Sequence, residues 1–395
     1  MKKKIVLAYS GSLDTTVIIP WLRENYDCDV IALCIDVGQN VNWKEIKSFA
    51  LKTGASACHV VDAKKEYIED FIWPILKTGA VYEEKYLLGT AAARALVAKI
   101  LVEYSGREKA EAVAHGASGQ GNDQFRLDTA ITTLAPALKI IAPRRIWRLK
   151  SREEEMRYLA RRNLPVPVTK KFAYNRDDNL WHVSHEGLEL EDPAAEPQYK
   201  KLLVKTVMPE KAPNKTVYLE IEFDKGIPVA LNGKKTDSLA LINSLNKIGG
   251  ANGIGIADLV ENRITGAKCR GVYESPGASL ICYAHRELER LCLDRQTLVF
   301  KQPVSLKTGE LVYNGLWFSP LREALSAFAD SVQKNVSGKV RLKLYKGTIT
   351  PAGAISPNSL FCKTTENKPA EKQATKKTTA KKQNKKPGKP KTAGK

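Results

Sequence analysis

The sequence predicts an α/β protein in which an open parallel sheet is followed by a second part of mixed α and antiparallel β structure. The first 164 residues alternate apolar runs of strand length with helical segments, which is the pattern of a parallel sheet. A turn of small residues, Ser10-Gly11-Ser12, directly follows the first apolar run. In the second part, turn dipeptides such as Asn232-Gly233 separate short alternating runs, which is typical of antiparallel hairpins.

The first part is expected to contain a sheet of parallel strands, each a short apolar run bounded by polar or turn residues. Continuous apolar sequence is typical of a strand that is buried on both faces. The expected strands are Ile5–Tyr9, Val30–Asp36, Ala57–Asp62, Ala112–His115 and Lys139–Ala142. Helices fill the intervals, notably Trp43–Lys52 and Thr90–Val102. Ligands of such sheets bind at the carboxyl ends of the strands.

A domain boundary is expected close to residue 165. Ser151 and Glu154 have the spacing of a capping box and predict a helix that ends before Pro165. The prolines at 165 and 167 then break the alternating pattern. The expected parts are a first domain of residues 1–164, a second domain of residues 165–361 and a tail of residues 362–395.

The second domain is predicted to be of the α+β class. Val217–Phe223 and Ile227–Leu231 alternate around a turn at Lys225-Gly226, and a last hairpin is expected to turn at Lys346-Gly347. The expected helices are Ser238–Lys247, Ala278–Leu293 and Pro320–Asn335.

Composition restricts the class of protein. The hydrophobic content of 43% is ordinary for a globular chain, and no apolar run approaches the roughly 20 residues that span a membrane. The basic start leads into a short strand rather than a signal peptide. The seven cysteines are odd in number and never spaced Cys-x-x-Cys, which predicts reduced thiols, a cytoplasmic location and no metal site.

The net charge of +20 is concentrated at the carboxyl end. Residues 363–395 hold twelve lysines and two glutamates, so half of the net charge lies in this tail. The tail has no aromatic residue and is predicted to be disordered. One interpretation is a solvated appendage; the other is a polycation that holds nucleic acid without sequence specificity.

The segment Ser10–Thr16 has the chemistry of a phosphate-binding loop. It connects a buried strand to a helical stretch, so backbone N–H groups and the helix dipole would face a bound anion. It lacks the Gly-Lys-Ser/Thr ending of a Walker loop and the three glycines of a dinucleotide fold.

A second glycine-rich segment, His115–Arg126, also follows a short strand and precedes a helix. It is therefore expected beside the first loop at the same edge of the sheet. Its glycines allow close approach of a ligand, Asp123 can bind an ammonium group and Arg126 can bind a carboxylate through two hydrogen bonds.

The two segments together resemble the argininosuccinate synthase family, whose phosphate loop is of the type of N-type ATP pyrophosphatases. The resemblance extends in order from residue 5 to about residue 360 through further blocks. These are Asp36-Val37-Gly38-Gln39, Phe71-Ile72-Trp73-Pro74, Tyr86-Leu87-Leu88-Gly89-Thr90, Pro165-Val166-Pro167, Val260-Glu261-Asn262-Arg263 and Arg270-Gly271-Val272-Tyr273-Glu274. The resemblance implies an adenine nucleotide α-hydrolase-like ATP pyrophosphatase domain followed by a synthetase domain.

The resemblance also implies a reaction. The ureido oxygen of citrulline attacks the α-phosphorus of ATP to give citrullyl-AMP and pyrophosphate, and the amino group of aspartate then displaces AMP. Such an enzyme uses ATP as a substrate, with Mg²⁺, together with citrulline and aspartate, and forms a homo-oligomer. A dimer or a tetramer is expected; the lysine-rich tail stands where the family has a helical arm that embraces neighbouring subunits.

The resemblance implies ligand-binding residues at the positions of this sequence that match the family's motifs. Those implied for ATP are Ala8, Tyr9, Ser10, Gly11, Ser12, Leu13, Asp14, Thr15, Thr16, Ile35 and Gly116. Those implied for citrulline are Tyr86, Ala91, Asn122, Arg126, Asn175, Ser184, Glu261 and Tyr273. Those implied for aspartate are Ser118, Asn122 and Asp123. Taken singly, Tyr86 and Tyr273 are better interpreted as packed aromatic residues; only their place in the ordered set of motifs favours a role in the site.

Several ligand positions depart from the family pattern. Ser12 replaces a glycine and would cost about 1 kcal/mol if that position needed a positive φ. The other departures are Thr16, Ile35, Ala91, Ser118, Gln120, Asn175 and Ile256. They keep two alternatives open: a weakened or non-catalytic paralogue that binds nucleotide or nucleic acid, and a ligase of the same mechanism with another substrate pair.

Overall fold

The parallel sheet predicted for the first part is present. In the computed structural model, which describes residues 2–119, 121–149, 151–167, 174–361 and 394, its strands lie in the order β3-β2-β1-β4-β5 and are all parallel. The strands are β1 (Lys3–Ala8), β2 (Cys28–Asp36), β3 (Ala57–Asp62), β4 (Ala112–Ala114) and β5 (Lys139–Ile141). The helices of this part are α1 (Leu13–Tyr26), α2 (Trp43–Lys52), α3 (Lys64–Glu66), η1 (Tyr67–Ile72), α4 (Trp73–Thr78), α5 (Gly89–Glu108), α6 (Asp123–Leu134), α7 (Pro143–Ile146) and α8 (Arg152–Ala160).

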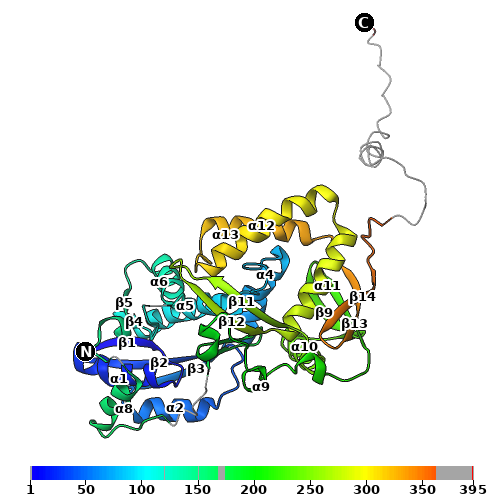
Figure 1. The fold of residues 1–395 in the computed structure, drawn as a ribbon. Coiled ribbons are helices and arrows are strands. Elements are labelled where there is room, and N and C mark those ends of the chain that lie inside the picture. The colour runs from blue at the N-terminus through cyan, green and yellow to red at the C-terminus, as the bar shows by residue number, and fades with distance from the viewer. Residues whose placement is uncertain (1, 120, 150, 168–173, 362–393, 395) are drawn as a thin grey trace. The chain divides into compact units, whose positions relative to one another are not determined.

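Helices cover both faces of this sheet because successive strand residues point to opposite sides. Ile5 and Leu7 of β1 pack with Ile18 of α1, whereas Val6 packs with Leu96 of α5. Figure 1 shows α1, α2 and α8 on one side of the sheet and α5 and α6 on the other. This double covering explains why the strands are continuously apolar.

The second part consists of antiparallel sheets and long helices, so the α+β prediction is confirmed. One sheet has the order β10-β9-β8-β13-β14 and the other the order β11-β12-β7-β6. The strands are β6 (Asn175–Asp178), β7 (Val183–Glu186), β8 (Val217–Asp224), β9 (Ile227–Leu231), β10 (Lys234–Lys235), β11 (Ile256–Asn262), β12 (Lys268–Glu274), β13 (Gly338–Tyr345) and β14 (Thr348–Ile355). The helices are η2 (Leu188–Glu191), α9 (Tyr199–Leu202), η3 (Pro209–Lys211), α10 (Ser238–Ala251), α11 (Pro276–Cys292), α12 (Arg295–Tyr313) and α13 (Pro320–Gln333).

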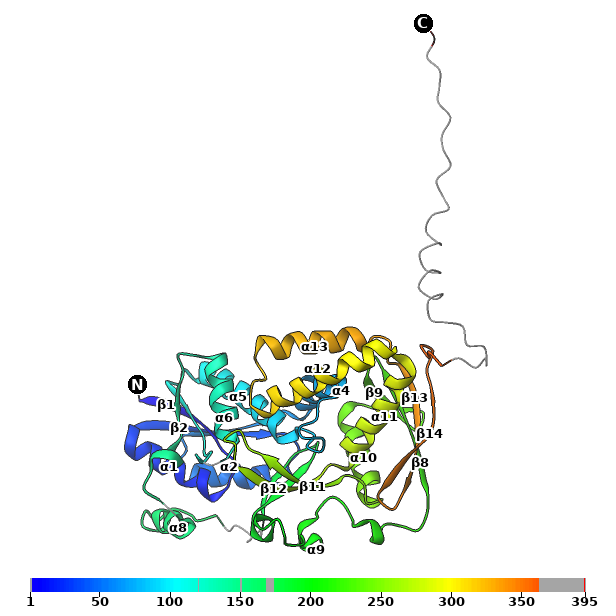
Figure 2. The same cartoon turned by 45° about the horizontal axis from the view of Figure 1, so that its top comes forward.

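Helix α12 is a long element that the sequence did not predict. Pro303 lies in its middle, where proline normally ends or kinks a helix. Asp294 caps its start by accepting a hydrogen bond from the Thr297 backbone N–H (3.0 Å). Helices α12 and α13 lie side by side in both views (Figures 1 and 2), and Tyr313, the last residue of α12, is completely buried.

Residues 1–359 form one compact unit, and Leu360 onward forms a second. The expected boundary close to residue 165 therefore stays a prediction. Within the described residues, no helix is both long enough and apolar enough to cross a membrane. The tail predicted to be disordered and nucleic-acid binding lies almost entirely outside the described residues.

Candidate active site

The predicted phosphate loop connects the end of β1, at Ala8, to the start of α1, at Leu13. Gly11 has a φ of +79°, and a Cβ atom there would lie 3.0 Å from the side chain of Ile46, so glycine suits this position. Ser12 has an extended backbone with φ −69° and ψ 163°, and its side chain caps α1. The strain considered for Ser12 therefore does not arise, because that position needs no positive φ.

Hydroxyl groups line the start of α1. The Oγ atoms of Ser10 and Ser12 lie 3.0 Å apart, and Thr15 Oγ1 lies 3.2 Å from the first and 3.1 Å from the second. Ser10 and Ser12 are exposed, whereas Thr16 is buried and hydrogen bonds through its hydroxyl to Tyr9 (3.2 Å). The loop thus presents rotatable donors beside a helix N-terminus, which is an arrangement suited to phosphate oxygens.

An acidic pair lies at the same helix start. Asp14 Oδ2 accepts a hydrogen bond from Arg144 (2.8 Å), and its side chain is about a third exposed. Glu155 of α8 is buried one turn before Leu159, which packs against α1. Burial and the nearby Asp14 raise the pKa of Glu155 to about 8, so this carboxyl holds a proton at neutral pH.

The second glycine-rich segment lies beside the phosphate loop, as predicted. A Cβ atom at Gly116 would come within 3.2 Å of the Thr15 methyl group and 3.4 Å of Ile18. His115 anchors the segment: its Nε2 lies 2.9 Å from Asp128 of α6, and it is 1% exposed. The end of β4 and the start of α1 are therefore in direct contact at the carboxyl edge of the sheet.

Three of the predicted substrate residues lie at the start of helix α6, with Asn122 as the residue just before it. Asn122 donates a hydrogen bond to the Tyr313 hydroxyl (2.8 Å), and Arg126 Nε donates to the Tyr313 carbonyl (2.8 Å). Asp123 accepts from Arg94 Nε (2.8 Å) and Arg126 (3.3 Å). The predicted carboxylate and guanidinium thus form an ion pair in which Arg126 is buried and Asp123 is about a third exposed.

The sheet β11-β12-β7-β6 positions further predicted residues across neighbouring strands. Tyr273 is paired with Ser184, and Ser184 with Asp177, so these residues lie in one row across three strands. Glu261 of β11 accepts a hydrogen bond from the Tyr273 hydroxyl (2.9 Å) and another from Tyr313 (2.8 Å). Asp177 in turn binds Arg94, so this sheet is joined to helix α5.

The remaining predicted residues occupy more scattered positions. The Tyr86 hydroxyl accepts a hydrogen bond from the Ala91 backbone N–H (3.1 Å), and both residues are buried. Asn175 begins β6 and is exposed, and Ser118 is half-buried in the glycine-rich segment. Ile35 is buried near the carboxyl end of β2, which pairs with β1.

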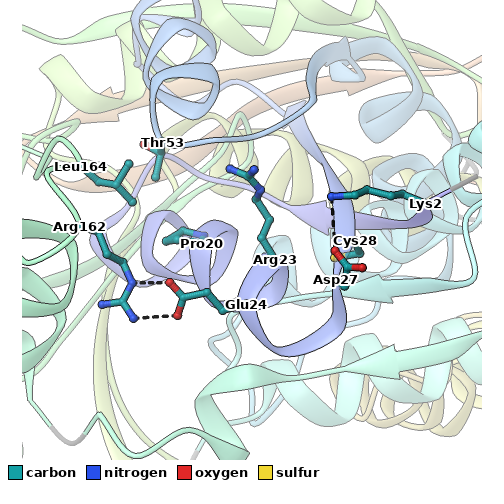
Figure 3. Close-up of a pocket in the computed structure, with 9 residues that line it drawn as sticks. All are labelled: Lys2, Pro20, Arg23, Glu24, Asp27, Cys28, Thr53, Arg162 and Leu164. Atoms are coloured by element: carbon teal, nitrogen blue, oxygen red, sulfur yellow. Dashed lines mark hydrogen bonds and ion pairs between the residues drawn. The ribbon is translucent and has the colours of Figure 1, made fainter.

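A separate pocket of about 370 Å³ lies at the other end of α1 (Figure 3). Four of its charged residues form two pairs: Arg162 binds Glu24 (2.5 Å) and Lys2 lies 3.4 Å from Asp27. Helix α1 has 14 residues and is therefore about 20 Å long. This pocket is thus remote from the phosphate loop and contains none of the predicted site residues.

Comparison with known proteins decides the family. The model of the arginosuccinate synthase N-terminal HUP domain matches residues 4–165, and that of the C-terminal domain matches residues 174–382. The argininosuccinate synthase of Brachyspira hyodysenteriae is 58% identical over 361 residues, which are 91% of this chain and 89% of that relative. That of Carboxydothermus hydrogenoformans is 58% identical over 363 residues, 92% and 90% of the two chains. The chain belongs to the argininosuccinate synthase family.

Burial and charge set the protonation of the cluster in this family member. Burial raises the pKa of Glu261, and the hydrogen bonds from Tyr313 and Tyr273 partly oppose that rise. Burial acts against the ionised form of Asp123, but Arg94 and Arg126 outweigh it and lower the pKa of this carboxyl. Asp123 is therefore ionised at neutral pH.

Departures from the argininosuccinate synthase pattern are accommodated locally. Ile256, one of these departures, begins β11 and packs with an apolar cluster that includes Val272 and Leu202. The side chain of Ala91 is buried, and its backbone N–H donates to the Tyr86 hydroxyl. Gln120 lies outside the described residues.

Three polar residues of the cluster were not predicted: Arg94, Asp177 and Tyr313. Arg94 lies one helical turn after Ala91, and Asp177 lies two residues after Asn175 on the same strand. The i, i+3 and i, i+2 spacings from predicted residues could have suggested these two. Tyr313 has no such signal, since it is 187 residues from Arg126 along the chain.

In the part of the chain that the structure describes, no group of three or more His, Cys, Asp or Glu residues could hold a metal ion. The described cysteines carry free thiols.

We predict that His182→Gln makes the free energy of unfolding less dependent on pH in the acid range. His182 is 1% exposed, its Nε2 lies 2.8 Å from Thr90 Oγ1, and burial lowers its pKa to about 3. Because an unfolded histidine titrates near 6.5, its contribution is complete above that pH and is lost as the pH falls towards 3. From pH 8 to pH 5, the wild type should lose about 2 kcal/mol more of unfolding free energy than the variant. Urea unfolding at both pH values measures this; equal losses would contradict it.

Proposed function

We propose that this chain joins citrulline to aspartate with ATP as the energy source, and so forms argininosuccinate, AMP and pyrophosphate. Membership of the family makes the chain an ATP-dependent ligase. The observation that carries the proposal is the contact between Gly116 and Thr15. It places the segment that holds Asn122, Asp123 and Arg126 next to the phosphate loop, so activation and ligation can occur at one edge of the sheet.

ATP would bind with its phosphates at the start of α1. The hydroxyls of Ser10, Ser12 and Thr15 and the loop N–H groups would stabilise the negative charge, and Gly116 would lie against the nucleotide. Ala8 to Thr16 and Ile35 form the proposed site. Mg²⁺ keeps most of its ligands as water and substrate phosphates, and the partly exposed Asp14 carboxylate is suited to approach such an ion.

Citrulline would bind in the cluster between α6 and β11. Arg126 carries a buried positive charge suited to the α-carboxylate, and Glu261 can accept hydrogen bonds from an ammonium or ureido N–H group. Tyr86, Ala91, Asn122, Asn175, Ser184 and Tyr273 complete the proposed site.

Aspartate would bind along the glycine-rich segment, through Ser118, Asn122 and Asp123. The ionised Asp123 carboxylate suits the aspartate ammonium group. Arg94 and Arg126 already compensate part of its charge, so the pair can hold an ammonium without leaving an isolated buried carboxylate.

The protein's role in this mechanism is positioning and charge stabilisation. In the first step the bond from the ureido oxygen to the α-phosphorus forms and the bond to the β-phosphate oxygen breaks, which releases pyrophosphate. In the second step the aspartate nitrogen attacks the ureido carbon, AMP leaves with the ureido oxygen, and the nitrogen loses a proton. Neither step requires a covalent enzyme intermediate, and a preorganised charged site provides the required stabilisation.

The two alternatives gain no support from the comparisons, since the relatives named above carry the argininosuccinate synthase name at 58% identity. Ser12 was one reason to consider a weakened enzyme, and its role as the α1 cap removes that reason.

A homo-oligomer is also proposed. Helices α12 and α13 expose large apolar side chains: Val299 is 55%, Phe300 60%, Leu306 67% and Leu321 47% exposed. Exposed apolar groups on two neighbouring helices favour burial against another surface, here a second copy of the chain. Sedimentation at micromolar concentration gives the number of subunits. The cytoplasmic location also stays a prediction.

The lysine-rich tail is proposed to retain nucleic acid without sequence specificity. Its net charge of +10 over residues 363–395 supports salt-sensitive binding to phosphates. Deletion of this segment is expected to abolish retention of duplex DNA at low salt and to leave the thermal transition unchanged. Equal retention by the truncated protein would contradict this role.

The experiment that tests the function is pyrophosphate release by the purified protein with ATP, citrulline and aspartate, each omitted in turn. Release should require ATP and citrulline, and argininosuccinate should form only when aspartate is also present. No release with the full set at high substrate concentrations would refute the proposal. Release without citrulline would instead support another substrate pair.

A further inference from the structure

Tyr313 lies where α12 ends and contacts several of the proposed citrulline residues at once. Its hydroxyl donates a hydrogen bond to Glu261 Oε1 (2.8 Å) and accepts one from Asn122 Nδ2 (2.8 Å). Its carbonyl oxygen accepts from Arg126 Nε (2.8 Å). One residue of the second part thus joins Asn122 and Arg126, at the start of α6, to Glu261 of β11.

We infer that Tyr313 is a positioning residue of the citrulline site, whose hydroxyl fixes the Glu261 carboxylate and the Asn122 amide and whose carbonyl fixes the Arg126 guanidinium. This inference rests on the proposed function, because it assigns a role towards the substrate of that reaction. Tyr313 itself is fully buried and acts through these three side chains.

The surroundings of Tyr313 leave its ring little freedom. The ring stacks on Tyr82, with centroids 3.6 Å apart and planes inclined by 9°, and the Arg126 guanidinium lies 4.8 Å from the centroid of the Tyr313 ring. Just after the helix, Gly315 has a φ of +78°, and a Cβ atom there would lie 2.5 Å from Arg126 Cα. The chain therefore turns tightly against α6, which fixes the Tyr313 carbonyl relative to Arg126.

The direction of the hydrogen bonds determines their chemical effect. Asn122 donates its amide N–H to the Tyr313 oxygen, and its own carbonyl oxygen accepts from the Ile264 backbone N–H (2.9 Å). The single Tyr313 proton is then directed to Glu261. Burial raises the pKa of the Tyr313 phenol, so the proton is present throughout the neutral range. A donor at the carboxylate stabilises its ionised form.

Some of the groups around Glu261 raise its pKa and others lower it. The titratable and charged residues that face it, besides Tyr313 and the neighbouring Tyr82, are Glu83, Tyr86, Arg126, Glu186, Cys269 and Tyr273. Burial raises the pKa of Glu261 and Glu83 adds to the rise, whereas Tyr313, Tyr273 and Arg126 lower it. Loss of the Tyr313 hydroxyl therefore removes a contribution that keeps Glu261 ionised.

Tyr313→Phe tests the role, since it keeps the ring and removes the hydroxyl. With ATP and aspartate saturating, KM for citrulline should rise about tenfold, while KM for ATP stays within twofold of wild type. The acid limb of kcat/KM for citrulline should move to higher pH, because Glu261 then becomes protonated at a higher pH. Tyr345→Phe is the matched control, since Tyr345 lies on β13 and its hydroxyl binds only the side chain of Asn214 among the described residues.

Replacement of Tyr313 by 3-fluorotyrosine provides a second test that preserves the shape of the side chain. The fluorinated phenol is more acidic and donates more strongly, so the acid limb should move to lower pH. This variant decides the question if Tyr313→Phe does not fold.

Each outcome supports or overturns the inference. An unchanged acid limb and an unchanged KM for citrulline would overturn it, with the proposed function intact. Equal losses towards all three substrates with an unmoved pH profile would show a purely structural role and would also overturn it. A wild-type protein that releases no pyrophosphate would overturn both the inference and the proposed function.

Discussion

Arg126→Lys is expected to lower kcat/KM for citrulline about a hundredfold while the protein still folds. The Arg126 guanidinium donates to the Tyr313 carbonyl through Nε and binds Asp123 through another nitrogen (3.3 Å). A lysine ammonium is a point charge without this fork, so it cannot keep both partners and also meet a carboxylate in the same plane. Loss of a hydrogen bond to a charged group costs about 1.5–3 kcal/mol, which corresponds to ten- to about a hundredfold.

The measurement is steady-state kinetics with citrulline varied at saturating ATP and aspartate. KM for ATP should change little, because the phosphate loop is a separate part of the site. Arg290→Lys is the matched control: Arg290 is exposed on α11 and pairs with Glu287 (2.6 Å). A wild-type kcat/KM in Arg126→Lys would contradict the assignment of Arg126 to citrulline.

Glu274→Gln should lower the free energy of unfolding by about 3 kcal/mol. Glu274 is fully buried and accepts hydrogen bonds from the backbone N–H groups of Val204 (2.9 Å), Lys205 (2.7 Å) and Thr206 (2.6 Å). His185 Nε2 lies 2.8 Å from the same carboxylate. A glutamine amide has only one acceptor oxygen, so its NH₂ group would face N–H donors and leave them unsatisfied.

The charge of the Glu274 carboxylate also contributes to the free energy of unfolding. Burial acts to raise the pKa of Glu274, but His185 and the backbone N–H groups outweigh it and lower the pKa. The stabilisation is therefore present at neutral pH and is lost as the pH falls through the folded-state pKa.

Urea unfolding at pH 7 measures the loss, and Glu310→Gln on α12 is the control because Glu310 is half-exposed and pairs with Lys307. That control should change stability by less than about 0.5 kcal/mol. Glu274→Gln with wild-type stability would contradict a structural role for this buried carboxylate. Tyr273 precedes Glu274 on β12, so a rise in KM for citrulline should accompany the loss of stability.

Local patterns were sufficient to predict the parallel sheet and the phosphate loop. Alternating apolar runs predicted β3 and α2 with the observed bounds, and Ser151 caps α8 as its spacing indicated. These features depend on neighbouring residues and on periods of two or 3.6 residues.

Contacts between segments distant in the sequence could not be predicted from local patterns. Helix α12 was missed because Pro303 contradicts helical propensity, and tertiary packing overrides that propensity. The links from Tyr313 to Asn122 and Glu261 span 191 and 52 residues. Ser12 is a local feature that the sequence also did not predict. Only the backbone angles reveal that this residue is a helix cap rather than a strained glycine position.

The most direct test of the reaction is the fate of the ureido oxygen. Citrulline labelled with ¹⁸O at this position is incubated with the protein, ATP and aspartate, and the AMP product is analysed by mass spectrometry. Attack of the ureido oxygen on the α-phosphorus predicts one ¹⁸O atom in each AMP and none in pyrophosphate. AMP without the label, formed together with argininosuccinate, would contradict the citrullyl-AMP intermediate and with it the mechanism proposed for this site.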